Sequence, residues 1–189
     1  MLKPLLLSLS LLSTQAFAAW QLDNDASQLS FTSIKKNSIA ENHHFEQLSA
    51  QIDDNQLSMV IELASVESLI PIRNERMQKM LFNVAQFPKA VIEADLAPYL
   101  GSLKLGHQVL KSVPVTLNLH GQKQQLMLDL AVVQTARQLI VSPTKAVLVN
   151  ATDYKLEQGI EALRKIAGLD SIAKSVPVTF NLVFNQQDF

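Results

Sequence analysis

The chain has 189 residues, of which 48% are hydrophobic and 17% charged, and its formal net charge is −1. This length fits a single domain, the apolar share excludes a disordered chain, and the lack of a basic excess argues against nucleic acid as a partner. The absence of Cys excludes disulfides, thiolate metal sites and a Cys nucleophile.

Residues 1–18 have the parts of a secretory signal peptide. Lys3 precedes an apolar run that is too short to anchor in a bilayer, and Ala16-Phe17-Ala18 supplies small residues before a cleavage site. We therefore expect residues 1–18 to be removed and residues 19–189 to form one domain. No later stretch is long and apolar enough to span a membrane as a helix. The expected product is a soluble, exported protein of the bacterial periplasm.

Alternation of apolar and polar residues predicts that most of the remaining chain forms strands. In chain order, the pattern indicates a strand that begins at 29–32, followed by strands at 44–52, 57–63, 90–96, 113–119, 126–132, 146–150 and 176–184. Asp53-Asp54-Asn55 is a polar turn cluster, so the strands on either side of it should form a hairpin. Because each strand has one apolar face, the prediction is an antiparallel sheet covered on one side, which means a sandwich or a barrel.

Two segments change to helical spacing. Within 71–84, one helix face is expected to hold Met77, Met80, Leu81 and Val84, and the helix should end before Phe87-Pro88. Within 154–168, the apolar stripe consists of Leu156, Ile160, Leu163 and Ala167. Gly168 follows this stripe at the position of a C-terminal cap, with Leu169 available for the apolar contact that accompanies such a cap.

Few residues could support catalysis or bind a metal. The four His are His43, His44, His107 and His120. His43 and His44 are adjacent, so on a strand they point to opposite faces and do not share a metal. We expect no metal, no resident cofactor and no catalytic residue. Met77 and Met80 are either core or the lining of a site for an irregular apolar ligand, and a barrel of about eight strands can hold one such ligand.

The sequence resembles the YceI family of exported, lipocalin-like proteins over essentially all of residues 19–189. The residues that support the resemblance are Trp20-Gln-Leu-Asp23, Ser65-Val66-Glu67-Ser68, the segment 72–77, Leu81-Phe82, Phe87-Pro88, the segment 117–121 and the final strand at 176–184. Asn74 and Arg76-Met77 stand where the family pattern has Asp and His-Leu, which leaves the specificity for a head group open.

The resemblance implies an extended antiparallel, lipocalin-like β-barrel with a helix beside its entrance. It also implies an elongated apolar pocket for a polyisoprenoid or another long-chain amphiphile, such as a quinone or a fatty-acid derivative. From strand phase and helix face, the expected pocket residues are Phe31, Phe45, Leu48, Ile61, Leu63, Met77, Met80, Leu81, Phe82, Leu117, Leu119 and Phe180. Arg73, His43 and His44 are the candidates for contact with a polar head.

The expected function is that of a periplasmic carrier that copurifies with an isoprenoid or acyl-chain ligand and that forms a monomer or a homodimer. Two alternatives remain. One is a small exported enzyme that acts on the bound lipid. The other is an outer-membrane barrel, which one Trp and two Tyr support poorly because such barrels have two aromatic girdles.

Overall fold

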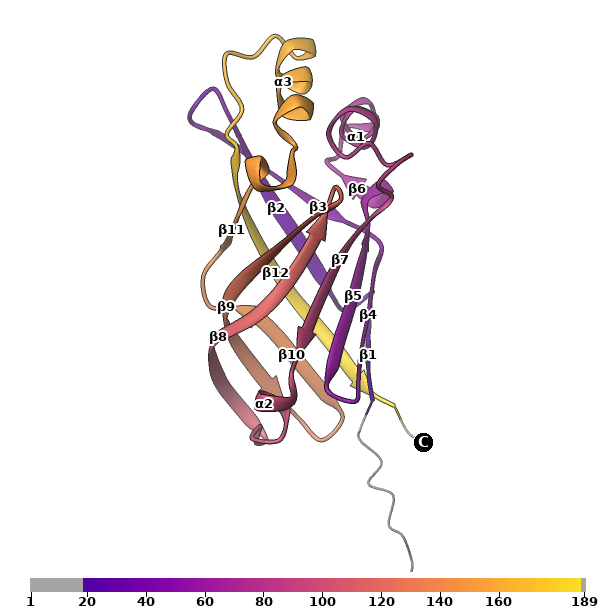
Figure 1. The fold of residues 1–189 in the computed structure, drawn as a ribbon, viewed down its shortest axis with the longest axis vertical. Coiled ribbons are helices and arrows are strands. Elements are labelled where there is room, and N and C mark those ends of the chain that lie inside the picture. The colour runs from indigo at the N-terminus through magenta and orange to yellow at the C-terminus, as the bar shows by residue number, and fades with distance from the viewer. Residues whose placement is uncertain (1–18, 188–189) are drawn as a thin grey trace, which may run out of the picture.

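The computed structural model describes residues 19–187 as a closed antiparallel β-barrel with helical segments at both ends (Figure 1). The predicted signal peptide lies outside the described residues. The strands are β1 (Trp20–Leu22), β2 (Gln28–Lys35), β3 (Ile39–Phe45), β4 (Leu48–Asp53), β5 (Gln56–Glu62), β6 (Val66–Glu67), β7 (Lys89–Asp95), β8 (Gly106–Leu119), β9 (Gln122–Gln134), β10 (Gln138–Pro143), β11 (Val147–Asn150) and β12 (Ser175–Gln186). The helical segments are η1 (Leu63–Ser65), α1 (Pro71–Arg76), η2 (Met77–Leu81), α2 (Ala97–Leu100), η3 (Ala151–Tyr154) and α3 (Glu157–Ile166).

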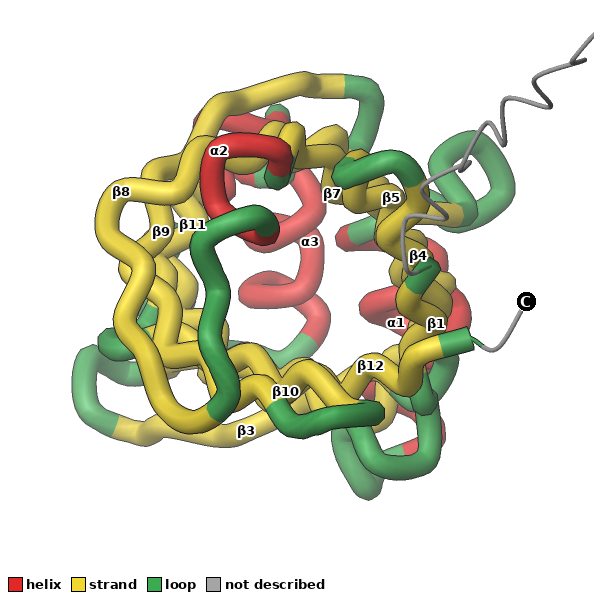
Figure 2. Tube along the Cα trace, turned by 90° about the horizontal axis from the view of Figure 1, so that it is seen from below, coloured by secondary structure: helices red, strands yellow, loops and turns green. Residues whose placement is uncertain are grey.

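The barrel is closed by a cycle of eight strands in the order β1-β4-β5-β7-β8-β9-β10-β12, in which β12 pairs back with β1. Trp20 faces Gln186 across this last pairing. Seen along the barrel axis, the strands form a ring, with α2 at the near end and α3 at the far end (Figure 2). The predicted fold class, an antiparallel barrel of about eight strands with short helices, is confirmed.

Strand β12 belongs to two parts of the wall. Its second half pairs with β10 and β1, whereas its first half pairs with β11 on one side and β2 on the other. Strands β3 and β6 follow β2, so the wall continues beyond the closed ring toward α1 and α3. We call this the helical end of the barrel.

Alternation along the strands places the core inside the barrel. In β8, Val113, Val115, Leu117 and Leu119 are buried while the residues between them are more exposed. The hairpin of β4 and β5 also forms as predicted. Its turn residues Asp54 and Asn55 both have positive φ, 45° and 62°, as a two-residue hairpin with the twist of its strands requires.

The strand predicted at 44–52 is wrong, because the chain turns a corner within it. β3 ends at Phe45 and β4 begins at Leu48. The amides of Glu46 and Gln47 donate to the backbone oxygen and Oγ of Ser65, at 3.1 and 3.0 Å. These bonds satisfy the backbone while the chain passes from the β3–β6 pair to the β4–β5 hairpin. The elements β1, β6, β10 and α2 were not predicted, and only the last two residues of β3 lie in a predicted strand.

The helix predicted over 71–84 is shorter and changes type. α1 ends at Arg76, and the chain continues as a π-helical turn, η2, in which the amide of Phe82 donates to the oxygen of Met77. This wider i→i+5 turn carries Phe82 onto the buried side with Leu81 and shifts Met80 away from it. The segment therefore ends at Leu81 rather than just before Phe87-Pro88.

The second predicted helix begins later than expected and ends as predicted. Tyr154 lies in η3, Lys155 has φ of 55°, and α3 starts at Glu157. At the other end, Gly168 has φ of 60°, its amide donates to Lys165, and the amide of Leu169 donates to Arg164. This pair of bonds is the Schellman arrangement that the glycine indicated.

Candidate functional site

The interior of the barrel encloses an elongated cavity of about 230 Å³. Every residue that lines it is apolar or aromatic, and the lining draws on the strands around the ring and on helical segments from both ends. Empty apolar cavities of about 150 Å³ stay dry and bind molecules such as benzene. A cavity of this size and lining is therefore suited to an apolar chain.

The end of the barrel away from α1 and α3 is covered by α2 and the residues beside it. Leu96, Tyr99, Leu100 and Leu103 contribute to the lining there. The amide of Leu96 donates to the oxygen of Asn55 at 2.8 Å, which fixes the start of α2 to the β4–β5 turn. This end is thus an apolar floor joined to the barrel wall.

At the helical end, η2 and α3 meet over the cavity. Leu81 and Phe82 from one side, and Leu156 and Ile160 from the other, are part of the lining. The two segments approach closely at Gly159, where an added Cβ would lie 2.5 Å from the oxygen of Met80 and 2.7 Å from the Cα of Leu81. No strand ladder joins them, so side-chain packing and this close approach hold the cover together.

The structure places most of the expected pocket residues on the cavity. Phe31, Phe45, Ile61, Leu63, Leu81, Phe82, Leu117, Leu119 and Phe180 all line it. Leu48, Met77 and Met80 do not, which corrects their expected place. Leu48 and Met77 are buried elsewhere in the core, and the π-helical turn leaves Met80 half-buried outside the cavity. The part that these side chains play in ligand binding stays a prediction.

Most of the lining residues were missing from the predicted set, although the sequence contains the signal for many of them. Met59 and Ile52 lie in phase with Ile61 and with the buried residues of β4, so hairpin register alone would have assigned them to the interior. Leu126, Leu128, Leu130 and Val132 of β9 also line the cavity and share the face that the alternation indicated.

Polarity increases along the inner face of the β2–β3 hairpin toward the helical end. Phe31 is paired with His43, and Ser33 with Glu41. Phe31 lines the cavity, and the ring of His43 contacts it edge-on at 5.2 Å between centroids. The Nε2 of His43 lies 2.9 Å from the Oγ of Ser33. The same face therefore passes from aromatic to neutral polar to charged side chains as it leaves the cavity.

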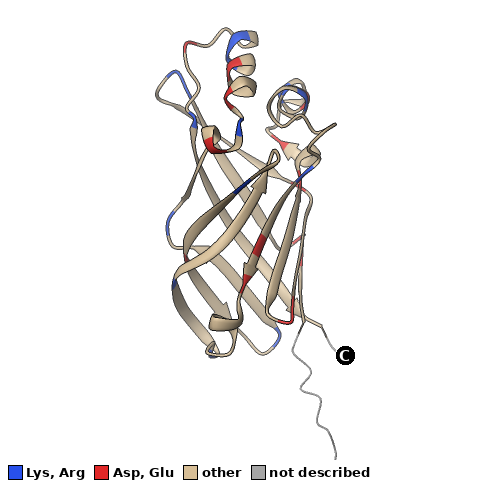
Figure 3. Cartoon of the chain, viewed as in Figure 1, with Lys and Arg blue, Asp and Glu red and all other residues tan. Residues whose placement is uncertain are grey.

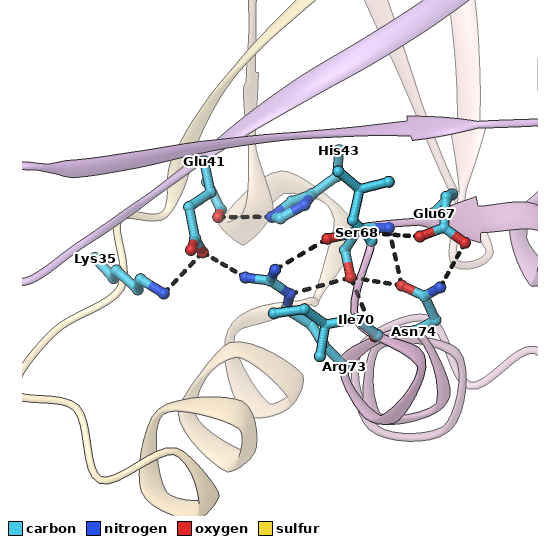
Figure 4. A network of polar contacts seen from close by, with 10 residues as sticks. Lys35, Glu41, His43, Glu67, Ser68, Ile70, Arg73 and Asn74 are labelled. Atoms are coloured by element: carbon cyan, nitrogen blue, oxygen red, sulfur yellow. Dashed lines mark hydrogen bonds and ion pairs between the residues drawn. The ribbon is translucent and has the colours of Figure 1, made fainter.

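Arg73 of α1 closes this polar region from the other side (Figure 4). Its Nη1 donates to the Glu41 carboxylate at 2.5 Å, and Lys35 lies 2.8 Å from the same carboxylate oxygen. Its Nε and Nη2 donate to the Oγ and backbone oxygen of Ser68, each at 3.0 Å. A single guanidinium thus links α1, the β2–β3 hairpin and the segment after β6.

Ser68 and Asn74 continue the network. The Ser68 amide and hydroxyl donate to the Oδ1 of Asn74 at 2.9 and 2.5 Å, and the Asn74 amide donates to Glu67 at 2.8 Å. The hydrogen bond from Asn74 holds the pKa of Glu67 below its usual range. Asn74 therefore fixes the turn into α1 through bonds that need both a donor and an acceptor on one side chain.

His43 is a buried polar group in contact with Phe31, which lines the cavity. It is 2% exposed, and among the described residues its Nδ1 has no hydrogen-bond partner. Burial lowers the pKa of His43, and the nearby positive charge of Arg73 lowers it further. The Lys35 hydrogen bond, with help from Arg73, lowers the pKa of Glu41. At neutral pH, then, a neutral imidazole lies beside an ion-paired carboxylate.

The three candidate head-group residues, Arg73, His43 and His44, divide between two faces. Arg73 and His43 lie together at the polar end of the cavity, although neither lines it. His44 follows His43 on β3, is half-buried and pairs with Glu67 on the opposite face. The sequence could not indicate Lys35, Glu41 or Ser68 as their neighbours, because these contacts depend on how α1 packs on the hairpin.

Within residues 19–187, no group of three or more His, Asp and Glu side chains is placed to hold a metal ion. In the same range, no helix has both the length and the apolarity needed to cross a membrane. The described arrangement can bind a chain with one apolar and one polar end.

Comparison with known proteins gives a consistent result. The family model described as the YceI-like domain matches residues 20–184. A polyisoprenoid-binding domain from Saccharophagus degradans is 35% identical, with a TM-score of 0.86 over 90% of this chain and 100% of that one.

Two more distant structures share the fold. BcnA of Burkholderia cenocepacia is 20% identical, with a TM-score of 0.66 over 86% of this chain and 98% of that one. The YceI protein of Campylobacter jejuni is 16% identical, with a TM-score of 0.56 over 77% and 85% of the two chains. No curated protein sequence matches the chain.

Proposed function

The chain belongs to the family of YceI-like domains, and from this membership we propose that it binds and carries a long-chain amphiphile in the barrel cavity. The ligand class is a polyisoprenoid, a quinone with a prenyl tail, or a fatty-acid derivative. The polyisoprenoid-binding description of the Saccharophagus degradans domain supports this class for a relative that covers nearly the whole chain. The proposal assigns no catalytic residue.

The observation on which the proposal depends is the continuous apolar lining of the cavity. Transfer of an apolar chain from water into such a site is favourable by about 0.8 kcal/mol for each buried CH₂ group. The affinity therefore grows with the length of the chain, and binding needs no charged partner inside the barrel. A lining without polar groups also disfavours ligands that are polar along their length, because these would lose hydrogen bonds to water.

The polar end of the ligand is proposed to lie at the helical end, beside His43 and Arg73. The Nδ1 of His43 has no partner among the described residues, and the His43 ring contacts Phe31, which in turn contacts Phe45. Both Phe residues line the cavity. A buried polar atom without a partner is costly, so a hydroxyl or carbonyl group of the ligand would relieve that cost. His44 faces away and is not part of this proposal.

We also propose that this carrier acts in the periplasm after removal of residues 1–18, in keeping with the leader-like sequence. A carrier of this kind keeps an insoluble chain in solution between membranes. Fractionation of cells that express the full chain would test the compartment: release with the periplasmic contents is expected, and retention in the cytoplasm would refute it.

The binding proposal is tested by extracting the protein, purified from its host, and identifying the released lipids by mass spectrometry. The informative variant is A90F, because Ala90 is buried and lines the cavity, so a phenyl ring there occupies ligand space. The matched control is A131F, since Ala131 lies between the inward-facing Leu130 and Val132 and points outward. A lipid in the wild-type protein and the control, but not in A90F, is expected. A wild-type protein that is repeatedly empty and binds no prenyl or acyl chain would refute the proposal.

A further inference from the structure

Exposed apolar side chains gather at the helical end. Three segments project there: the β2–β3 hairpin, the turn into α1, and the end of α3 (Figure 1). The hairpin exposes Ile39, the turn exposes Leu69, Ile70 and Ile72, and the end of α3 exposes Ile166. Leu69 is 87% exposed, and Ile72 and Ile166 are about half exposed. Scattered apolar residues are ordinary on a surface, but three neighbouring projections that each carry an exposed aliphatic side chain are not.

Leu69 is also held in a backbone conformation that leucine rarely adopts. Its φ is 62°, in the left-handed region. Its amide donates to the Glu67 carboxylate, and on either side the backbone is fixed by the bonds among Ser68, Asn74 and Arg73. The same network that lies beside the cavity therefore presents Leu69 to solvent, and strained residues of this kind cluster at functional sites.

Basic residues accompany each projection. The segments 35–41, 67–79 and 161–174 each contain one more Lys or Arg than Asp or Glu, although the whole chain has a net charge of −1. Ion pairs there use both signs of charge, for example Glu41 with Lys35 and Arg73, and Glu161 with Arg164 and Lys165. Within the described residues, Lys36, Arg76 and Lys174 of these segments form no ion pair. In Figure 3, all three projections contain ribbon coloured blue for Lys and Arg, and red acidic positions lie near them.

We propose that the helical end docks on a phospholipid membrane surface that contains anionic lipids, with the exposed aliphatic side chains of the three projections inserted between the head groups. Insertion of aliphatic side chains flanked by Lys and Arg is the way that peripheral proteins bind such surfaces. The inference rests on the proposed function, because a carrier must exchange its chain with a bilayer. At the docked end, η2 and α3 cover the cavity, and no strand ladder joins these two segments to each other.

The test is sedimentation of the purified protein with vesicles, in which the bound fraction gives a partition coefficient. The vesicles contain phosphatidylethanolamine and phosphatidylglycerol in equal parts, and vesicles of phosphatidylcholine alone serve for comparison. Tighter binding to the anionic vesicles is expected, and added salt should weaken it because screening reduces the electrostatic part.

The informative variant is L69N with I72Q. Asn tolerates the left-handed conformation at position 69, so this variant should fold at least as well as the wild-type chain. It should lower the partition coefficient by roughly tenfold or more, since two exposed aliphatic side chains no longer enter the bilayer. The matched control is L105N with M127Q, at exposed apolar positions outside the three projections, and it should bind as the wild-type protein does. K36Q with R76Q should lower binding by about fivefold for each charge removed.

The outcomes separate this inference from the proposed function. A wild-type protein that holds a copurifying lipid but binds neither kind of vesicle refutes docking and leaves the carrier function intact. An empty protein that still binds anionic vesicles refutes the carrier function alone. Equal binding by L69N/I72Q and by the control also refutes docking. Dimerisation that L69N/I72Q abolishes, without vesicle binding by the wild type, would show instead that a second copy covers this end.

Discussion

Replacement of Gly159 by Ala should change the free energy of unfolding through two effects of opposite sign. Gly159 lies inside α3, where Ala is the better helix former and should stabilise the chain by about 0.5–1 kcal/mol. In this position, however, the new Cβ would lie 2.5 Å from the Met80 oxygen and 2.7 Å from the Leu81 Cα. Both atoms belong to the backbone of η2, so they cannot give way by a change of rotamer.

The steric effect should prevail. Forcing extra volume into a packed contact costs about 1–3 kcal/mol. We therefore expect G159A to be destabilised by up to about 2 kcal/mol, which lowers the melting temperature by about 2–4 °C for each kcal/mol in a domain of this size. Because the clash pushes α3 and η2 apart over the cavity, a bound lipid should also leave faster than from the wild-type protein.

The assays are urea unfolding, thermal melting and the transfer rate of a fluorescent acyl chain from the protein to vesicles. The control is G101A. Gly101 ends α2 with φ of −65°, and nothing lies within 4 Å of the added Cβ, so this variant should be as stable as the wild-type chain or slightly more. A cooperatively folded G159A with wild-type stability or higher would refute the reasoning, because helix propensity alone would then decide the result.

Three further predictions concern buried groups and a cap. The pKa of His43 is lowered by burial and by Arg73. The unfolded chain therefore takes up this proton first, and stability falls as the pH drops below about 6.5. Urea unfolding at pH 7 and at pH 5 gives the stability lost on acidification, and H43Q should lose less than the wild-type protein. An equal loss in both proteins would contradict this. Burial raises the pKa of Tyr154 to about 12, and its hydroxyl lacks a partner among the described residues. Y154F should accordingly be as stable as the wild-type chain or more so, and a loss above about 1 kcal/mol would reveal a missed hydrogen bond. Gly168 has φ of 60° with open space around it, so G168A should cost about 1 kcal/mol and G168N less. Equal melting temperatures of G168A and G168N would show that the positive φ of residue 168 is not the cause of the destabilisation.

The sequence predicts the parts of the fold in which one physical requirement dominates. Strict alternation identified β8, β9 and β12, because each of these strands buries one face against the interior. Strand β10 was not predicted because Leu139, Ile140 and Val141 form a continuous apolar run without alternation. Such a run does not distinguish a strand from a buried helix turn.

In the candidate site, too, local sequence patterns predict some residues, whereas the place of others depends on tertiary structure. Strand phase, which is local information, correctly assigned part of the apolar lining, such as Phe31, Ile61 and Leu117. The place of Met80 did not, since a π-helical turn changes which side chains share a face and has no clear signal in the sequence. The contact of Arg73 with Glu41 joins a helix to a hairpin 32 residues away in the sequence, and tertiary packing alone determines it.

The double role of β12 has a consequence for the order in which the barrel can form. Ring closure depends on the pairing of Trp20 with Gln186 and of Leu139 with Phe184, and both pairs need the last strand. Because synthesis proceeds from the N-terminus to the C-terminus, the barrel cannot close before the final strand is available. Until then β1 and β10 keep open edges, so the nascent chain has the slow, non-local folding of a high-contact-order topology and needs protection against premature strand pairing.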